Sequence, residues 1–214
     1  MSQRGIFITF EGPEGAGKST QIANLHDYLV QQCGRSVVVT REPGGTPLAE
    51  EFRQILKHHN TAEPIYPLTE VLLFLAGRVQ NVRQNIAPAL DVGKVVLCDR
   101  FMDSTLAYQG YARMLDVEKI RQLNQTIMGN VKVDLTILLD LPVEAGFART
   151  GKRAETKGNF DRLEAENIAF HQRVRQGFLA IAEQEPERVK VFDAQLSAEE
   201  LTLQIIQAVN HVLR

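Results

Sequence analysis

A glycine-rich stretch near the start of the chain constrains the fold more than any other part of the sequence. Residues 12–19 read Gly-Pro-Glu-Gly-Ala-Gly-Lys-Ser, which fits the pattern G-x-x-x-x-G-K-[ST]. The apolar run 5–10 precedes it and is typical of a buried strand, and apolar residues at helical spacing follow it up to Gly34. A strand, a glycine loop and a helix in this order place backbone N–H groups and a helix N-terminus around an anion. The sequence therefore predicts a site for nucleotide phosphates.

Three side chains of this loop carry a charge or a hydroxyl. Lys18 supplies a cation for the β- and γ-phosphates, and Ser19 supplies a hydroxyl for Mg²⁺. Glu14 is less expected, because a carboxylate beside phosphates is unfavourable unless it faces a donor on another group. Two interpretations stay open for Glu14: it faces a hydroxyl of a second substrate, such as that of a sugar, or it is a solvated acid of the loop.

Composition excludes several classes of protein. The chain has 214 residues, of which 44% are hydrophobic and 23% charged, and its net charge of −2 gives no general attraction to nucleic acid or membranes. Its two cysteines, Cys33 and Cys98, indicate buried packing rather than a disulfide, and no Cys/His cluster indicates a metal site. No apolar run reaches about 18 residues and no leader begins the chain, so we expect a cytoplasmic protein.

Apolar strands alternate with helices along the rest of the chain. Besides 5–10, strands are expected at 36–40, 94–98, 135–141 and 189–192. Helices are expected at 47–57, 68–91 with a disturbance at Pro88, 103–112, 116–129, 143–150, 161–184, and after the capping box Ser197–Glu200. This pattern predicts a single α/β domain over 1–214, with a five-stranded parallel sheet covered by helices on both faces. Ligands are then expected at the carboxyl ends of the strands, where Gly12, Arg41, Asp99 and Asp193 stand.

The phosphate loop alone does not choose among kinases, switches, transporters and helicases, although N-K-x-D and L-S-G-G-Q signatures are absent from the sequence. Phe74 and Arg78 lie four apart on one helix face, where a ring and a guanidinium suit a base. On spacing alone, core packing with a surface arginine is the favoured interpretation. Asp99-Arg100 closes a buried strand, and the next helix carries the i,i+4 pairs Ser104/Tyr108 and Thr105/Gln109, which suit either a site or an ordinary helix surface.

Taken together, these stretches resemble the bacterial thymidylate kinase family. The matching stretches are 10–20 (FEGPEGAGKST), 40–46 (TREPGGT), 99–101 (DRF) with Ser104, 107–110 (AYQG), 161–162 (DR) and 193–194 (DA). The resemblance covers essentially the whole chain. It implies a P-loop NTPase fold with a short lid segment, phosphoryl transfer from ATP to dTMP with Mg²⁺, and a homodimer in which the 68–91 helix forms the contact.

The resemblance also implies roles for individual residues. ATP and its phosphates would contact Gly12, Pro13, Glu14, Gly15, Ala16, Gly17, Lys18, Ser19 and Thr20, with Ser19 also at the metal. The dTMP site would comprise Glu42, Arg53, Phe74, Arg78, Asp99, Arg100, Ser104, Thr105, Tyr108 and Gln109. In that site Phe74 stacks on thymine and Arg78 reads its O4. Arg53 and Arg100 hold the monophosphate.

Two further roles concern the sugar and the lid. By the same resemblance, Glu14 faces the 3′-hydroxyl and Tyr108 crowds the 2′ position. Residues 150–160 are rich in Lys, Arg and Gly, which predicts a mobile basic loop, and this loop resembles the lid of the family. The resemblance implies that the lid supplies a catalytic arginine. Compared with the usual pattern, about four extra residues lie between 147–149 and 161–162, so this arginine is either Arg149 or Arg153. A kinase for another nucleoside monophosphate and a nucleotide-dependent switch remain the alternative functions.

Overall fold

The fold is built on a parallel five-stranded sheet. The structure, a computed structural model, describes residues 4–59, 62–157 and 162–213, without the side chains of 152–157. Within these residues the strands lie in the order β2-β3-β1-β4-β5, and every neighbouring pair is parallel. Their bounds are β1 Ile6–Glu11, β2 Val37–Arg41, β3 Val95–Asp99, β4 Leu135–Asp140 and β5 Val189–Asp193. The predicted α/β class, strand number and parallel pairing are confirmed.

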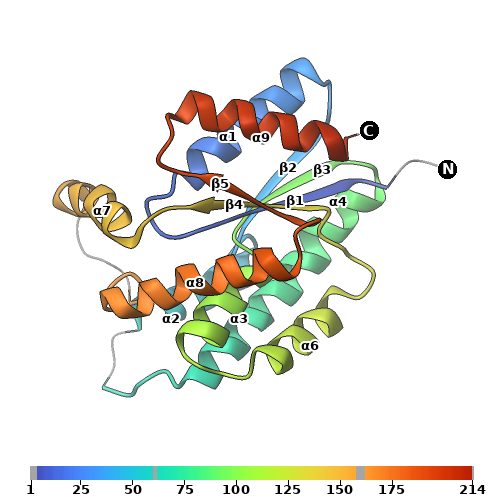
Figure 1. Cartoon of the computed structure of the whole chain (residues 1–214). Coiled ribbons are helices and arrows are strands. Elements are labelled where there is room, and N and C mark those ends of the chain that lie inside the picture. Colours follow the sequence, from blue (N-terminus) through green and yellow to red (C-terminus); the bar gives the residue numbers. More distant parts are fainter. Residues whose placement is uncertain (1–3, 60–61, 158–161, 214) are drawn as a thin grey trace.

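Helices cover both faces of this sheet (Figure 1). One face carries α1 (Lys18–Asp27), which continues as the π-helical segment η1 (Tyr28–Gln32), and α9 (Ala198–Val212). The other face carries α3 (Pro67–Asn81), η2 (Val82–Ile86), α4 (Ala87–Asp91), α5 (Met102–Thr105), η3 (Leu106–Ala112) and α8 (Ile168–Gln184). Outside these lie α2 (Pro47–His58), against α3, and α6 (Val117–Met128). The remaining helix, α7 (Val143–Lys157), projects beyond the carboxyl edge of the sheet, at the left of Figure 1.

The central strands are apolar on both sides because both of their faces are buried. In β1, Phe7 faces the α3–α4 layer while Ile8 faces α1 and α9, and both are fully buried. The edge strands differ, since Val39 in β2 and Val191 in β5 are about half exposed. This is the burial pattern that a doubly covered parallel sheet requires of its sequence.

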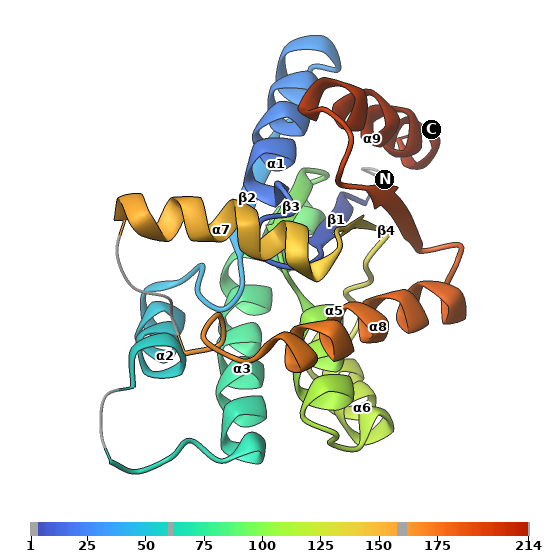
Figure 2. The same ribbon diagram turned by 60° about the vertical axis from the view of Figure 1, so that its left-hand side comes forward.

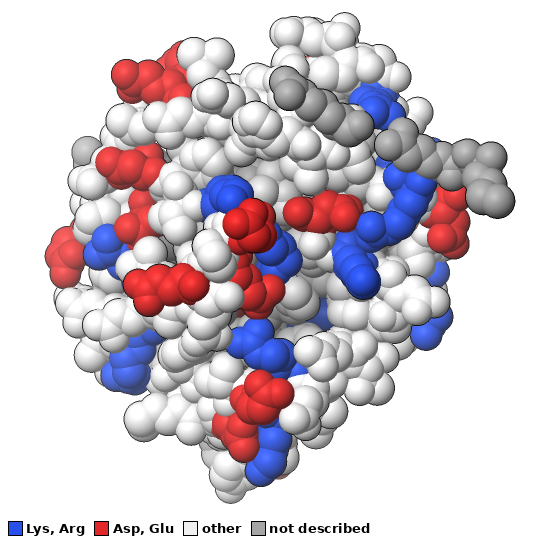
Figure 3. Space-filling view, turned by 45° about the vertical axis from the view of Figure 1, so that its right-hand side comes forward, with Lys and Arg blue, Asp and Glu red and all other residues white. Residues whose placement is uncertain are grey.

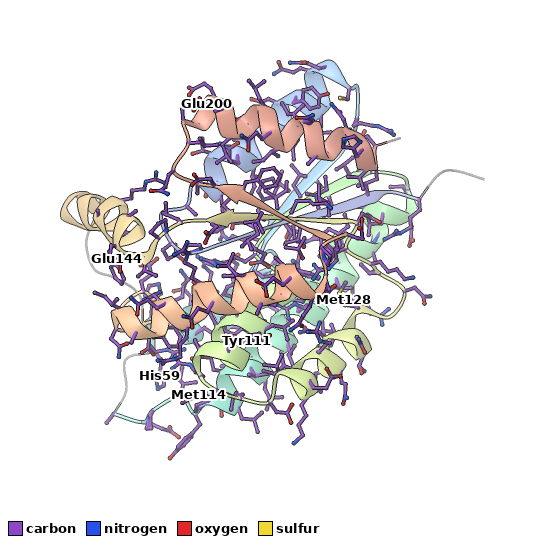
Figure 4. All side chains as sticks on the ribbon, in the orientation of Figure 1. His59, Tyr111, Met114, Met128, Glu144 and Glu200 are labelled. Atoms are coloured by element: carbon purple, nitrogen blue, oxygen red, sulfur yellow. The ribbon has the colours of Figure 1, made fainter. Side chains whose placement is uncertain are left out.

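Two local signals place the helices as expected. Thr46 caps α2 by accepting from the Ala49 N–H at 3.2 Å. Ser197 and Glu200 form the predicted capping box of α9, and Glu200 is labelled at that helix end in Figure 4. The first helix turn of α9 is thereby fixed directly after β5.

The predicted long helix after residue 67 is confirmed, with its disturbance one turn before the proline. The segment runs as α3, the π-helical η2 and α4. Pro88 sits near the start of α4, and its ring conflicts with the backbone carbonyl four residues earlier, at Gln84. Gln84 lies in the middle of η2, so the wider π turns absorb the proline without ending the helical path.

The prediction for the segment after β4 was wrong in two respects. The helix expected at 143–150 continues to Lys157 as α7, so 150–157 is helical rather than a loop, and 158–161 lies outside the described residues. Alanine, glutamate, lysine and arginine in this stretch favour a helix even though few apolar residues mark one. The following helix begins at Ile168 rather than at 161, because the Asn167 side chain caps it by accepting from the Phe170 N–H at 2.9 Å.

A close contact brings α8 against the helical segment that lines the site. Tyr111 of η3, labelled in Figure 4, packs on Gly177 of α8, where an added Cβ would lie 2.8 Å from the tyrosine Cβ. Glycine is therefore needed at 177 for this approach.

Within the described part of the chain, no helix combines the length and apolar character needed to cross a bilayer. On the face drawn in Figure 3, basic and acidic side chains are interspersed rather than gathered by sign.

Candidate functional site

A cavity of about 260 Å³ opens at the carboxyl edge of the sheet, beside the phosphate loop. The expectation that ligand-facing residues gather at this edge is supported by the strand register, which places Arg41 beside Asp99 and Asp140 beside Asp193. All ten residues predicted for the acceptor site line the cavity, namely Glu42, Arg53, Phe74, Arg78, Asp99, Arg100, Ser104, Thr105, Tyr108 and Gln109. Of the loop residues, Glu14, Gly15, Gly17, Lys18, Ser19 and Thr20 line it too, whereas Gly12, Pro13 and Ala16 do not.

The phosphate loop has the backbone that its glycines predict. Gly12, Gly15 and Gly17 have φ angles of 133°, 76° and 90°, in the region that disfavours other residues. Lys18 begins α1 and folds its side chain back, so that Nζ donates to the carbonyl oxygens of Gly12 and Pro13 at 3.2 and 3.0 Å. Burial and the nearby Arg100 lower the pKa of Lys18.

Glu14 forms an ion pair that neither sequence interpretation contained. Arg100 donates from Nη2 to Glu14 Oε1 at 2.5 Å and from Nη1 to the Gly12 carbonyl at 3.0 Å. Burial alone would raise the pKa of Glu14, but the positive charges of Arg100, Lys18 and Lys57 outweigh it and lower that pKa to about 2. Glu14 is thus a charged acceptor at the cavity wall, with Arg100 as its partner inside the protein.

Glu11, at the end of β1, is a site residue that the sequence analysis missed. It is fully buried and accepts from the Phe101 N–H at 2.8 Å and from the Ser104 N–H and hydroxyl at 3.3 and 2.6 Å. Burial, with the nearby Asp103 adding to it, raises the pKa of Glu11 to about 8. These contacts fix the backbone turn at Arg100, whose φ is 64°, and so orient two cavity residues. A carboxylate at the end of a buried strand was the available signal.

The interpretation that spacing alone favoured, a core Phe74 with a surface Arg78, is wrong. Arg78 is the buried member, only 1% exposed, while Phe74 is partly exposed at the cavity. The Arg78 guanidinium donates from Nε to Glu42 at 2.8 Å, from Nη1 to Asn124 at 2.6 Å and from Nη2 to Thr105 at 3.0 Å. Asn124 was not anticipated, because it comes from α6, far along the chain. Among the described residues, one Nη1 N–H of Arg78 has no acceptor, which leaves a donor for a ligand.

Tyr108 forms an apolar wall of the cavity. Its ring packs edge-on against Phe170 and Phe178 of α8, with centroid distances of 6.1 and 6.3 Å. Burial raises the pKa of Tyr108 to about 12, so the phenol is neutral near pH 7. The Arg100 guanidinium lies 5.4 Å from the centroid of the Tyr108 ring.

The lid arginines are placed only in part. Arg149 Nη1 donates to the carbonyl oxygens of Gly15 and Ala194 at 3.2 and 3.0 Å, so α7 is attached to the phosphate loop, but Arg149 does not line the cavity. Arg153 belongs to α7, and its side chain lies outside the described residues. The choice between the two stays a prediction.

Comparison with known proteins shows to which family the chain belongs. A model of the thymidylate kinase family matches residues 10–205. The chain belongs to the thymidylate kinase family. It is 49% identical over 212 residues to the thymidylate kinase of Desulfovibrio desulfuricans, covering 98% of this chain and 97% of the relative. It is 48% identical to that of Deinococcus radiodurans, with 98% of both chains covered. A crystal structure of thymidylate kinase from Ehrlichia chaffeensis superposes with a TM-score of 0.76 at 36% identity, covering 96% of this chain and 99% of that one.

In this member of the thymidylate kinase family, two buried polar atoms at the cavity have no hydrogen-bond partner among the described residues. They are Asp99 Oδ1 and His171 Nε2. The described residues contain no group of three or more His, Cys, Asp or Glu side chains that would hold a metal alone. His171, Lys57, Leu163 and Glu164 line the cavity and were not predicted. They come from helix ends and connecting segments, where no motif marked them.

Proposed function

We propose that this chain transfers the γ-phosphoryl group of ATP to dTMP, giving ADP and dTDP in the synthesis of dTTP. Membership of the thymidylate kinase family supports this reaction. The observation that carries it is the shared cavity, which the phosphate loop residues Lys18 and Ser19 line together with all ten predicted acceptor residues. A donor phosphate bound by the loop and an acceptor phosphate would therefore lie in the same cavity, close enough to react directly.

The acceptor is proposed to lie with its base toward α3 and η3. Phe74 would stack on thymine, and Arg78 would donate to O4 with the N–H that protein acceptors leave available. Arg53 and Arg100 would hold the monophosphate at the end nearer the loop. Burial of Arg78 supports a recognition role, because a desolvated donor discriminates strongly against a group that cannot accept from it.

The sugar is proposed to lie between Glu14 and Tyr108. The ionised carboxylate of Glu14 would accept a hydrogen bond from the 3′-hydroxyl. The packed ring of Tyr108 would leave no room for a hydroxyl at C2′. Ser104, Thr105 and Gln109 would complete the wall around the base.

The chemical step would need no covalent intermediate. An oxygen of the acceptor phosphate would attack the γ-phosphorus in line while the bond from this phosphorus to the β–γ bridging oxygen breaks, and ADP would leave with that oxygen. The attacking oxygen is already ionised, so no strong base is required. Lys18 supplies a fixed positive charge for the transferring group, and Arg149 or Arg153 of α7 would add a second. Closure of α7 over the site would exclude water and limit hydrolysis of ATP.

Magnesium is proposed to bind between Ser19 and Asp99. Asp99, whose buried Oδ1 has no partner among the described residues, and the exposed Ser19 both line the cavity. Mg²⁺ takes few protein ligands in such sites because phosphates and water complete its coordination, so this small donor set fits it. When bound, it would offset charge on the β- and γ-phosphates.

A homodimer through α3 is the proposed assembly. Leu68, Leu72 and Val79 of α3 are 60, 54 and 40% exposed and share one helix face. On α2, which packs against α3, Leu48 and Ile55 are exposed as well. Sedimentation should give a dimer for the wild type and a monomer for Leu72→Glu. The control Leu203→Glu, on the exposed side of α9, should remain a dimer. A wild-type monomer, or a dimeric Leu72→Glu, would contradict the proposal.

Two alternatives are separated from the proposal by one assay. ADP formation is followed with ATP and Mg²⁺, with and without a panel of monophosphates. A kinase makes ADP rapidly only with an acceptor, whereas a nucleotide-dependent switch makes it at the same rate without one. Another nucleoside monophosphate kinase would prefer a different member of the panel. A cytoplasmic location stays a prediction.

A further inference from the structure

A fully buried carboxylate, Glu70 of α3, holds the amide of a cavity residue. Gln109 of η3 lines the cavity, and its Nε2 donates to Glu70 Oε1 at 2.7 Å. Arg113 donates to the same carboxylate from Nε at 2.8 Å and from Nη2 at 3.2 Å, and Arg162 donates from Nη2 at 2.5 Å. Glu70 itself is 0% exposed and does not line the cavity.

The protonation state of Glu70 decides which end of the Gln109 amide faces it. Burial alone would raise the pKa of Glu70, but the hydrogen bonds from Arg113 and Gln109 and the charge of Arg162 outweigh it and lower that pKa. An ionised carboxylate only accepts hydrogen bonds, so the amide must turn its nitrogen toward Glu70. The amide oxygen, Oε1, then points away from Glu70, and it has no hydrogen-bond partner among the described residues.

A donor lies beside this acceptor. Arg78, Thr105 and Gln109 all line the cavity, and Arg78 Nη2 donates to Thr105, which directly precedes the segment that carries Gln109, so the guanidinium and the amide belong to the same part of the cavity wall. The wall therefore offers a donor next to an acceptor. The complementary base edge carries a carbonyl next to an N–H, as O4 and N3–H do in thymine and uracil. Cytosine presents the reverse at both positions.

We infer that Glu70 is a positioning residue for base selection, which fixes the Gln109 amide so that Oε1 accepts from N3–H of the acceptor base. The inference rests on the proposed function, since it takes the base of dTMP to occupy this wall. Glu70 acts through Gln109 and touches no substrate. Its effect is on the choice between bases rather than on phosphoryl transfer.

The test is the ratio of kcat/KM for dTMP to that for dCMP in Glu70→Gln. The glutamine side chain has the same shape but both donates and accepts, so the Gln109 amide is no longer held in one orientation. We expect the ratio to fall by about 10-fold or more, since one mismatched buried hydrogen bond changes affinity by roughly 10-fold. Glu70→Asp keeps an acceptor-only group and should retain more of the ratio, even where its overall activity is lower.

A matched control separates this effect from a general loosening of the cluster. Glu166 pairs with the same Arg113, at 2.9 Å, without contacting Gln109. Glu166→Gln should keep the wild-type ratio. An unchanged ratio in Glu70→Gln, or an equal fall in Glu166→Gln, would overturn the inference. Wild-type turnover of dTMP in the same series tests the proposed function separately.

Glu70→Gln leaves two arginines without their carboxylate, which destabilises the fold, and a second measurement covers the case of a variant that does not fold. Neutron diffraction of the wild type with dTMP in deuterated solvent then decides the question, because it distinguishes the two ends of an amide. The inference predicts deuterium on the Gln109 atom facing Glu70 and none on the atom facing thymine N3. Deuterium on the thymine side would overturn it.

Discussion

Replacing Glu11 by glutamine should change how stability depends on pH. The glutamine keeps an acceptor for the Phe101 and Ser104 N–H groups and can donate to the Ser104 hydroxyl, so the local contacts are retained. Wild-type Glu11 holds its proton up to a pKa of about 8, whereas the unfolded chain loses it near 4.5. Between these values the unfolded state binds fewer protons, so wild-type stability falls as the pH rises. The glutamine variant lacks this loss.

The size of the effect follows from the two pKa values. Each pH unit within the window from 4.5 to 8 changes the free energy of unfolding by about 1.4 kcal/mol. From pH 5 to pH 7.5, the stability of Glu11→Gln relative to wild type should therefore rise by about 3 kcal/mol. Below pH 4.5 the Glu11 carboxyl of the wild type is protonated in both the folded and the unfolded state, and the glutamine variant has no proton to lose there, so the difference should be constant.

Urea unfolding at several pH values measures this difference directly. Glu51→Gln, which alters an exposed carboxylate on α2, is the control and should follow the wild-type curve. Parallel curves for wild type and Glu11→Gln from pH 5 to 7.5 would refute the reasoning. They would mean that the three donors of Phe101 and Ser104 keep Glu11 ionised despite its burial.

Three further predictions concern turnover. Lys18→Ala should leave a folded protein with kcat lowered by about 10²–10³-fold or more, because a fixed cation at the transferring phosphate is lost; near-wild-type activity would rule out the proposed ATP site. Arg149→Ala and Arg153→Ala, compared side by side, should lower kcat more than they raise the KM for dTMP if either is the lid arginine. The variant that does so identifies it, and an effect from neither places the charge elsewhere. Tyr108→Ala should reduce the ratio of kcat/KM for dTMP to that for its ribose counterpart, whereas an unchanged ratio would assign the 2′ position to another group.

Much of the scaffold was predictable because its signals are local. The strand, glycine loop and helix around Lys18 are contiguous in sequence. Strands that are buried on both faces are continuous apolar runs, and such runs predict a parallel sheet. The acceptor residues came from the family resemblance, and the cavity brings all ten of them together. Residues near strand ends, such as Asp99, were placed correctly since the carboxyl ends of parallel strands meet at one edge.

What the sequence did not predict depends on partners far away in the chain. Burial of Arg78 requires Glu42 from the segment after β2 and Asn124 from α6, and neither is visible from the spacing of Phe74 and Arg78. The Glu70 cluster likewise joins α3, η3 and the segment before α8. Helix α7 was mistaken for a loop beyond residue 150, because few apolar residues mark a helix there although its residues have good helix propensity.

Steady-state ADP formation with ATP, Mg²⁺ and a set of acceptors tests the central claim most directly. Rapid turnover is predicted with dTMP and dUMP, whose O4 accepts from Arg78, and none above background without an acceptor. With dCMP, kcat/KM should be lower by at least about 10-fold, since an amino group meets the buried guanidinium. Equal ADP formation with and without acceptor would contradict the kinase, and equal kcat/KM for dCMP and dTMP would contradict the base site.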